Sequence, residues 1–364
     1  MPPPYLGGGS YFVYNRAMFR LSHKLKKLKD GATIGIISPS SDAASIFPEV
    51  YQLGVGNLKK YFNFNVKEFA ATKARYSPSQ EHVLARVKDI HAAFLDKEVD
   101  AIITAIGGDD SIRLLPHLDK NIVEENPKIF MGFSDAVSLL TYFAKLGLPS
   151  FHGPALMAGF AEPEGLMPEV LKHFKSFFMD AWKTYPYDVF TQWTEDKYGW
   201  TDSNFPSRRK SYVRNTPPHI LNRGTNDIGI LVGGCIEIIE MLKGTAFGLQ
   251  SEDWGNAAFF FETSEDKPTP DYVKCALRSY GMAGAWHKAS LILIGKSRGY
   301  SMDEYRELED GVLEVVVREF GAKNIRIVSN YDFGHTQPIN ILPIGCTIQT
   351  DDEGNLTLIE SPFE

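Results

Sequence analysis

Cysteine is scarce in this chain of 364 residues, which contains only three. They are Cys235, Cys275 and Cys346, which are widely spaced and form no C-x-x-C pair. An odd number of dispersed cysteines argues against a disulfide framework and against a zinc knuckle. We therefore expect all three thiols to be small buried hydrophobes of a protein that stays in a reducing compartment.

Positive charge is also in short supply. The chain has 38 Lys and Arg residues against 45 Asp and Glu residues, which gives a formal net charge of -7. Proteins that track the phosphates of DNA or RNA need a concentrated excess of cations, so a nucleic-acid partner is not indicated. The one basic cluster, at residues 23–29, is short and is expected to be a solvated face.

Long apolar runs are missing as well. No stretch approaches the ~18 consecutive apolar residues of a membrane span, so no membrane association is predicted. Residues 1–10 are rich in Pro and Gly, and Asn15 and Arg16 interrupt the one aromatic patch that follows, so no signal peptide is indicated. We expect residues 1–30 to be a leader and the protein to be cytoplasmic.

What the chain does contain is an alternation of short apolar runs and helical patterns, with 43% hydrophobic and 23% charged residues overall. Strands are predicted at 33–38, 64–69, 100–106 and 128–133, with helical stretches around 45–61, 80–97 and 137–142. This alternation predicts an α/β fold whose parallel sheet is covered on both faces. The length favours two domains, the first over residues 31–182.

Residues 183–226 break the alternation and are rich in Trp, Tyr, Pro, Asn and Arg. We interpret them as a connection between domains that also borders the active site. A second α/β domain is expected over 227–364, with strands at 228–232, 257–261, 290–294 and 325–328. A closing hairpin is predicted from 347–349 and 356–358, which flank a turn-forming Asp-Glu-Gly-Asn sequence.

Chemistry in open α/β sheets lies beyond the carboxyl ends of the strands. One such end carries Ser134 and Asp135, where a sharp strand-to-helix turn would expose the serine hydroxyl beside a backbone N–H. The alternative is that both residues cap the helix, because Ser and Asp are common N-caps. A second end carries Gly107 and Gly108, which permit close approach of the backbone to a developing oxyanion or form a simple loop.

Two further strand ends carry groups that transfer or orient protons. His335 follows the last core strand in a loop bounded by Gly334 and Pro338, and its unperturbed pKa lies near neutrality. Glu262 ends a very apolar strand, where a buried carboxylate needs a partner such as an imidazole N–H. Each residue also has a purely structural interpretation, but together they supply a nucleophile, a base, an orienting acid and an oxyanion loop.

Several of these motifs occur in an order that resembles the LD-carboxypeptidase family, including its microcin C self-immunity branch, over roughly residues 31–350. The matching segments are Ser38-Pro39-Ser40, Gly107-Gly108 with the following Ser111 to Pro116, Gly132-Phe133-Ser134-Asp135, Phe151-His152-Gly153-Pro154, Gly233-Gly234-Cys235, the strand ending in Glu262, and Gly334-His335. Spaced motifs in the right order are more specific than any one of them.

The resemblance implies a role for each matching residue. Ser134 would be the nucleophile, His335 the general base, and Glu262 the group that orients the imidazole. The backbone N–H of Asp135 and one from Gly107 or Gly108 would form the oxyanion hole. The resemblance further implies a Rossmann-like N-terminal domain, a smaller C-terminal α/β domain, a site between them, frequent homodimers, no metal and no cofactor.

One segment departs from the murein-cleaving branch of the family. That branch has Arg-Gly-Gly-Tyr-Gly in its glycine loop, whereas this chain has Ile106-Gly107-Gly108-Asp109-Asp110. The loop is more similar to the self-immunity branch, which hydrolyses the amide of an aminoacyl or peptidyl nucleotide. Asp109 and three tryptophans are the candidate substrate-binding residues. The tryptophans, which would stack on a base or serve as packing residues, are Trp182, Trp193 and Trp200.

Three alternatives remain open at this stage. The first is a murein tetrapeptide carboxypeptidase. The second is an α/β-hydrolase, whose Ser, Glu and His follow in the same order, although Ala136 replaces the second glycine of the G-x-S-x-G elbow. The third is a non-enzymatic, two-domain ligand-binding protein in which Ser134 caps a helix.

Overall fold

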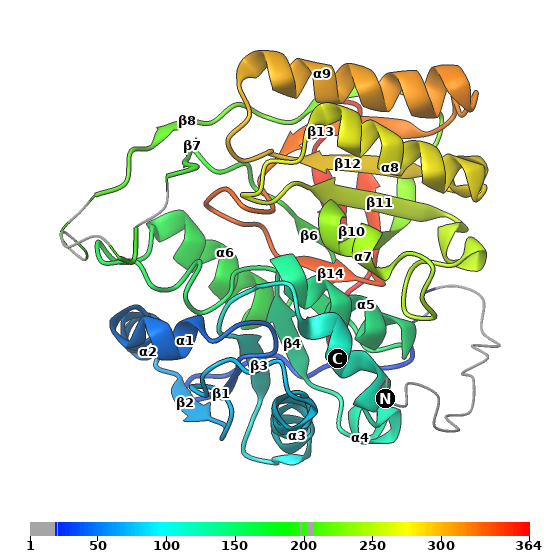
Figure 1. Ribbon diagram of the computed structural model, residues 1–364. Helices are drawn as coiled ribbons and strands as arrows, with labels where there is room; N and C mark the ends of the chain where they lie inside the picture. The colour runs from blue at the N-terminus through cyan, green and yellow to red at the C-terminus, as the bar shows by residue number, and fades with distance from the viewer. Residues whose placement is uncertain (1–18, 20, 197–198, 202–204, 206, 208) are drawn as a thin grey trace.

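The computed structural model describes residues 19, 21–196, 199–201, 205, 207 and 209–364. Most of the expected leader, residues 1–18 and 20, lies outside the described residues. In Figure 1 the blue-to-green half of the chain forms the lower part of the molecule, and the yellow-to-orange half forms the upper part. Each half is built on its own sheet, of six and eight strands, and a two-stranded ribbon joins β7 (Gln192–Trp193) to β8 (Val213–Arg214).

The first sheet has the strand order β14-β5-β4-β3-β1-β2. Strands β1 to β5 are parallel, and β14 pairs antiparallel with β5 at the edge. Its strands are β1 (Thr33–Ile37), β2 (Asn65–Glu68), β3 (Ala101–Thr104), β4 (Ile129–Gly132), β5 (Ser150–His152) and β14 (Leu342–Ile344). The central strands are buried on both faces, which explains why they appear in the sequence as continuous apolar runs.

The helices of this half follow its strands in the alternating pattern that the sequence predicts. They are α1 (Ala43–Ile46), α2 (Pro48–Phe62), α3 (Gln80–Leu95), α4 (Lys120–Glu125), α5 (Val137–Lys145) and α6 (Pro168–Phe178). Every residue of α5 except Lys145 is buried, because this helix is enclosed between the two halves of the molecule. Its first residues therefore position the serine turn rigidly between the sheets (Figure 1).

The second sheet has the order β6-β16-β15-β10-β11-β12-β13-β9. Its four central strands are parallel, and antiparallel strands extend both edges. The strands are β6 (Tyr185–Pro186), β9 (His219–Asn222), β10 (Ile228–Cys235), β11 (Ala257–Glu262), β12 (Leu291–Gly295), β13 (Arg326–Tyr331), β15 (Thr347–Thr350) and β16 (Leu356–Leu358). Its helices are α7 (Ile236–Leu242), α8 (Pro270–Met282) and α9 (Met302–Val312).

The α/β class and the two-domain arrangement are confirmed, and so is the closing hairpin of β15 and β16. The sheets do not follow the expected boundaries along the chain in three places. Strand β14 crosses back to the first sheet, while β6 and β9 join the second sheet from within the connecting segment 183–226. The second sheet therefore has more strands than the first. Edge strands of two to four residues carry too little periodicity to be recognised from sequence.

The two halves share one apolar core, to which both sheets contribute. Strand β10 touches the start of α5 so closely that a β-carbon on Gly234 would lie 2.5 Å from Cγ2 of Val137. The backbone of Gly234 also has a φ of 141°, which side-chain-bearing residues rarely adopt. Glycine at this position therefore lets the second sheet dock against the helix that follows Ser134. Among the described helices, none is long and apolar enough to cross a bilayer.

We expect Gly234→Ala to lower the free energy of unfolding by ~2 kcal/mol or more, because its methyl group would collide with Val137 in a strained backbone conformation. The urea midpoint measures this loss. The matched control is Gly311→Ala in α9, where an added β-carbon meets nothing closer than 3.5 Å. That control should leave stability unchanged or raise it by up to ~1 kcal/mol, since alanine favours helix. Equal midpoints for the two variants would contradict the docking role of Gly234.

Candidate active site

Ser134 lies on the turn between β4 and α5, at the carboxyl edge of the first sheet. Its φ of 58° places it in the left-handed region, which costs about 1–3 kcal/mol for a residue with a side chain. The turn is a short 3-10 segment, Ser134–Ala136, and neither it nor α5 has a side-chain cap hydrogen bond. Helix capping therefore does not explain Ser134. A strained turn that exposes a hydroxyl is the geometry of a nucleophile elbow.

The glycine loop lies directly against this serine. A β-carbon on Gly107 would lie 2.7 Å from Cβ and 2.8 Å from Oγ of Ser134. Any larger residue at position 107 would therefore displace the hydroxyl or the loop. The same hypothetical atom lies 3.5 Å from the backbone nitrogen of Asp135, so the loop and this N–H share one small space. The expected oxyanion residues Gly107, Gly108 and Asp135 are brought together around Ser134.

Buried polar contacts hold the loop in place. The Asp135 carboxylate is fully buried and accepts hydrogen bonds from the backbone N–H groups of Ser111, at 2.9 Å, and Asp110, at 3.2 Å. Asp110 is in turn ion-paired with the buried Arg86, which also donates to the carbonyl of Pro39 at 2.7 Å. Burial raises the pKa of Asp135, although hydrogen bonds from serines oppose the change. Sequence reasoning missed Arg86, because only the fold brings it to the loop.

His335 and Glu262 meet inside the second half of the molecule. Nδ1 of His335 lies 2.6 Å from Oε2 of Glu262, and both side chains are almost completely buried. Gly334 makes this approach possible, because a β-carbon there would lie 2.5 Å from Cγ of Glu262. Its φ of 103° is another conformation that favours glycine. The Phe133 ring packs edge-on against the His335 ring at 5.0 Å, which links the imidazole to the serine turn.

A second imidazole, that of His152, faces the other oxygen of Glu262. Its Nε2 lies 4.0 Å from Oε1, and His152 is fully buried. Burial by itself raises the pKa of Glu262, but the imidazoles of His335 and His152 outweigh it and lower that pKa to about 2. In the sequence, His152 stands out only as part of the family motif Phe151-His152-Gly153-Pro154. A histidine at the end of a buried strand was the signal that could have identified it.

Ser134 and His335 line one cavity of about 690 Å³, which we call the serine cavity. The loop residues Gly107, Gly108 and Asp109 also line it. Trp200 lies in its wall and contacts Phe47 edge-on at 5.3 Å. The structure therefore brings Asp109 and Trp200, two of the candidate substrate-binding residues, to the same space as Ser134, the expected nucleophile.

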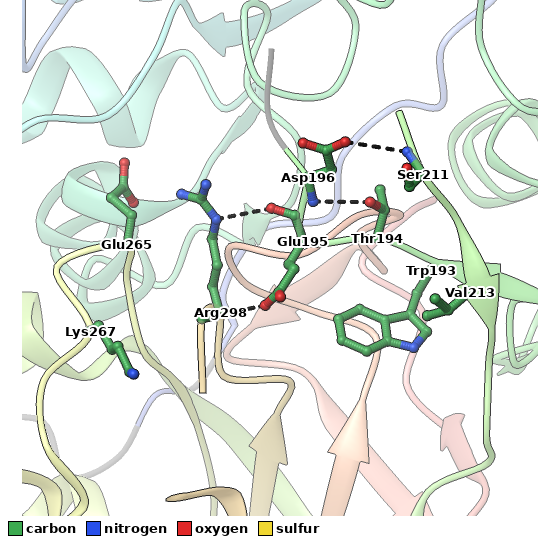
Figure 2. A pocket seen from close by; sticks show the side chains of 10 residues that line it. Trp193, Thr194, Glu195, Asp196, Ser211, Val213, Glu265, Lys267 and Arg298 are labelled. Carbon is green, nitrogen blue, oxygen red and sulfur yellow. Dashed lines mark hydrogen bonds between the residues drawn. The ribbon is translucent and has the colours of Figure 1, made fainter. Parts of the chain in front are cut away.

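Trp193 lies in an adjoining cavity of about 830 Å³, which we call the tryptophan cavity. Figure 2 shows its lining, in which Arg298 donates to the carbonyl of Glu195. Glu265 lines both cavities, so they are neighbours. Trp182 lines neither of them. Its ring packs 5.7 Å from Phe363 near the chain end, and its Nε1 donates to the carbonyl of Phe177, so it is a packing residue.

Cys235 also borders the serine cavity and is buried, as expected. Its ligand atom and those of Glu262 and His335 lie within 4.8 Å of one another, the spacing of a possible metal site. Glu262 and His335 already bind each other, however. Burial and the nearby carboxylates also raise the pKa of the Cys235 thiol well above its ordinary value. The other two thiols differ: Cys346 is buried, but Cys275 is exposed, contrary to expectation.

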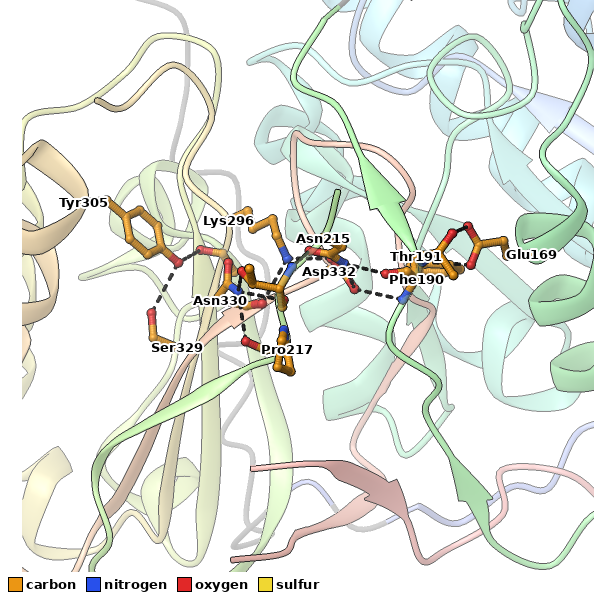
Figure 3. A network of polar contacts seen from close by, with 12 residues as sticks. Glu169, Phe190, Thr191, Asn215, Pro217, Lys296, Tyr305, Ser329, Asn330 and Asp332 are labelled. Carbon is orange, nitrogen blue, oxygen red and sulfur yellow. Dashed lines mark hydrogen bonds and ion pairs between the residues drawn. The ribbon is translucent and has the colours of Figure 1, made fainter. Parts of the chain in front are cut away.

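The loop that carries His335 is tied to the connecting segment. Asp332 pairs with Lys296 at 2.5 Å, and both side chains are almost completely buried. Asn215 donates to both carboxylate oxygens of Asp332, at 2.9 and 3.0 Å (Figure 3). Two backbone hydrogen bonds of 2.7 and 2.8 Å join Thr194 to Gln337. These contacts fix both ends of the His335 loop, so the connecting segment positions the imidazole.

Comparison with known proteins gives a consistent result. The LD-carboxypeptidase N-terminal domain matches residues 34–153, and the LD-carboxypeptidase C-terminal domain matches residues 228–350. The microcin C7 self-immunity protein MccF of Escherichia coli is 25% identical over 91% of this chain and 94% of its own length. A probable murein peptide carboxypeptidase of Bacillus subtilis is 26% identical over 95% of this chain and 97% of its own.

Solved structures agree with this result. The MccF-like protein of Streptococcus pneumoniae, determined in complex with AMP, superposes with a TM-score of 0.79 and 26% identity, over 91% of this chain and 99% of that one. The two family domains cover most of the chain and enclose the serine turn, Glu262 and His335. The chain therefore belongs to the LD-carboxypeptidase family and is a serine peptidase that hydrolyses amide bonds.

Proposed function

We propose that Ser134, His335 and Glu262 form the catalytic triad and that the enzyme cleaves the amide of an aminoacyl or peptidyl nucleotide. The observation that carries the triad is the 2.6 Å contact between the buried His335 and Glu262, on the wall of the cavity that Ser134 also lines. Glu262 holds the Nδ1–H of the imidazole, which leaves Nε2 to accept a proton. This division of roles is the one that a serine hydrolase requires.

The reaction follows from these positions. Ser134 Oγ attacks the scissile carbonyl carbon while His335 Nε2 takes its proton. The carbonyl oxygen becomes an oxyanion, which the N–H of Asp135 and an N–H of the Gly107-Gly108 loop stabilise. His335 then protonates the leaving nitrogen, the C–N bond breaks, and an acyl-enzyme remains on Ser134. Water, deprotonated by the same imidazole, releases the acid and restores the serine.

A nucleotide leaving group suits the two neighbouring cavities. Trp200 beside Phe47 in the serine cavity, and Trp193 in the tryptophan cavity, offer aromatic faces to a base. The relative from Streptococcus pneumoniae was solved with AMP, and MccF is a microcin C7 self-immunity protein. We therefore infer a detoxifying or self-immunity role. The alternative substrate is a murein tetrapeptide, which the name of the Bacillus subtilis relative suggests.

The remaining expectations follow from the family resemblance. We propose that the enzyme works as a homodimer in the cytoplasm, without metal or cofactor. An α/β-hydrolase is excluded because both domains match the LD-carboxypeptidase family instead. A purely ligand-binding protein is disfavoured by the same membership and by the buried His335–Glu262 pair, which binding alone does not require.

The substrate is tested by incubating the protein with an aminoacyl-sulfamoyl adenosine and, separately, with a murein tetrapeptide ending in D-Ala. We expect release of the free amino acid from the first compound, detected by mass spectrometry, and little release of D-Ala from the second. Release of D-Ala alone would assign the enzyme to murein recycling. If neither compound is cut, the proposed substrate classes are both wrong.

Ser134→Ala should reduce kcat/KM by at least about 10,000-fold, because the covalent step loses its nucleophile. Stability should stay within ~1 kcal/mol of the wild type, since one partly exposed hydroxyl is removed. The matched control is Ser138→Ala, one helical turn later, whose buried hydroxyl has no hydrogen-bond partner among the described residues. The control should keep full activity. Comparable activity of the two variants would remove Ser134 from the triad.

His152→Phe should lower kcat with little change in KM and should move the acid-side loss of activity to higher pH. In the wild type the carboxylate of Glu262, with a pKa of about 2 against an ordinary 4.5, stays ionised far below neutrality. Removing one imidazole lets burial raise that pKa, so protonation of Glu262 begins at higher pH. The other titratable groups that face Glu262 are His335 and Cys235.

The control for His152→Phe is His152→Gln, whose side-chain amide can donate to the same oxygen and should restore most of the activity and the original pH profile. The readouts are kcat, KM and the pH dependence of kcat/KM. Identical pH profiles for all three proteins would show that His152 only fills space.

A further inference from the structure

Among the described residues that line the serine cavity, the charged groups other than His335 are all acidic. They are Asp109 from the glycine loop, Glu237 from α7, and Glu265 and Asp266 from the segment after β11. Among the described residues that line this cavity there is no lysine and no arginine. The acids come from both halves of the molecule, so they surround the space in front of Ser134 rather than forming a patch on one side.

For three of these carboxylates, no described cation offsets the negative charge. Asp109, Glu237 and Asp266 form no ion pair with any described lysine or arginine. Glu237 accepts hydrogen bonds from the N–H of Ser264, at 2.9 Å, and from its hydroxyl, at 2.6 Å, which fix the position of the carboxylate at the cavity wall. Lys267 follows Asp266 in sequence, yet it lines the other cavity and pairs with Glu304 at 2.8 Å.

The imidazole of His335 faces the negative electrostatic potential of these carboxylates. Nε2 of His335 is buried without a hydrogen-bond partner, faces the serine cavity, and lies 3.2 Å from Oε2 of Glu265. The group that reaches Ser134 must therefore enter between this nitrogen and the acidic side chains. A carboxylate brought to this position would be repelled by at least three like charges, while an ammonium group would be attracted.

We propose that the acyl group of the substrate is cationic: an amino acid with a free α-ammonium group and a basic or neutral side chain, and not an acidic one. This inference rests on the proposed function and adds to it the charge of the residue that is released. In an aminoacyl amide the α-ammonium nitrogen is two bonds from the carbonyl carbon that is attacked, so it must enter the serine cavity with that carbon. The cationic side chain of a lysine or arginine residue would be attracted by the same carboxylates.

The test compares lysyl-, glutaminyl- and glutamyl-sulfamoyl adenosine, which share the leaving group and differ in the charge of the acyl residue. We expect kcat/KM to fall in that order, with at least about a 10-fold preference for lysyl over glutamyl at low salt. The preference should shrink at about 0.5 M salt, because screening weakens exposed charges. N-acetylation of the lysyl compound should lower kcat/KM further, since it removes the α-ammonium charge.

A variant identifies the source of the preference. Asp109→Asn combined with Asp266→Asn should reduce the lysyl-to-glutamyl ratio by about 10-fold while the glutaminyl rate changes less. The matched control removes two exposed carboxylates elsewhere, Asp271→Asn with Asp303→Asn on α8 and α9, and should leave the ratio unchanged. An equal fall in the ratio for both double variants would show that only net charge matters and would overturn the assignment to the cavity.

The outcomes separate this inference from the proposed function. Hydrolysis of all three compounds with glutamyl as fast as lysyl overturns the charge match and leaves the nucleotide substrate in place. If none is hydrolysed, the proposed function fails. Calorimetric binding to Ser134→Ala then decides the charge match by itself: tighter binding of the lysyl compound supports it, and equal or absent binding overturns it.

Discussion

The hydrogen bond between Glu262 and His335 is the contact on which the rest of the site depends. A fully buried carboxylate is strongly destabilising unless several partners compensate its charge. Here one imidazole comes from the loop after β13, and the other, His152, comes from β5 of the first sheet. Both imidazoles therefore face the carboxylate of Glu262 only when the two halves are docked. This requirement explains the glycines at 234 and 334, which allow the backbones to approach.

The position of His335 depends in turn on the connecting segment, residues 183–226. The loop with His335 has no regular structure of its own to hold it, because it lies beyond the end of β13. Its ends are fixed by the buried Lys296–Asp332 pair with Asn215, and by the backbone bonds between Thr194 and Gln337. A buried pair of this kind adds little net stability, but it specifies one conformation. The position of the His335 imidazole is therefore fixed by residues that are distant in sequence.

Sequence reasoning pointed to Ser134, Glu262 and His335 because each lies at or after the end of an apolar strand, and strand ends in α/β sheets meet at one edge. It could not identify His152 or Arg86 as support for the site, since a buried polar residue shows its partner only in the folded chain. The three tryptophans show the same limit. Their positions in the sequence made all three candidates for substrate binding, but only the fold determines which side chains reach a cavity. Trp200 and Trp193 line cavities, whereas Trp182 packs on Phe363. The crossing of β14 was equally invisible, because three apolar residues fit either sheet.

An acidic cavity around Ser134, the proposed nucleophile, has a consequence for catalysis as well as for binding. Attack on the carbonyl creates a negative oxygen, and the carboxylates of Asp109, Glu237 and Asp266 disfavour any added negative charge nearby. Backbone N–H groups at the glycine loop and at Asp135 oppose this effect, but they are dipoles rather than full charges. A cationic acyl group would supply the missing positive charge next to the oxyanion as it forms. Charge on the substrate would then accelerate the chemical step itself, because the interaction grows as the transition state is approached.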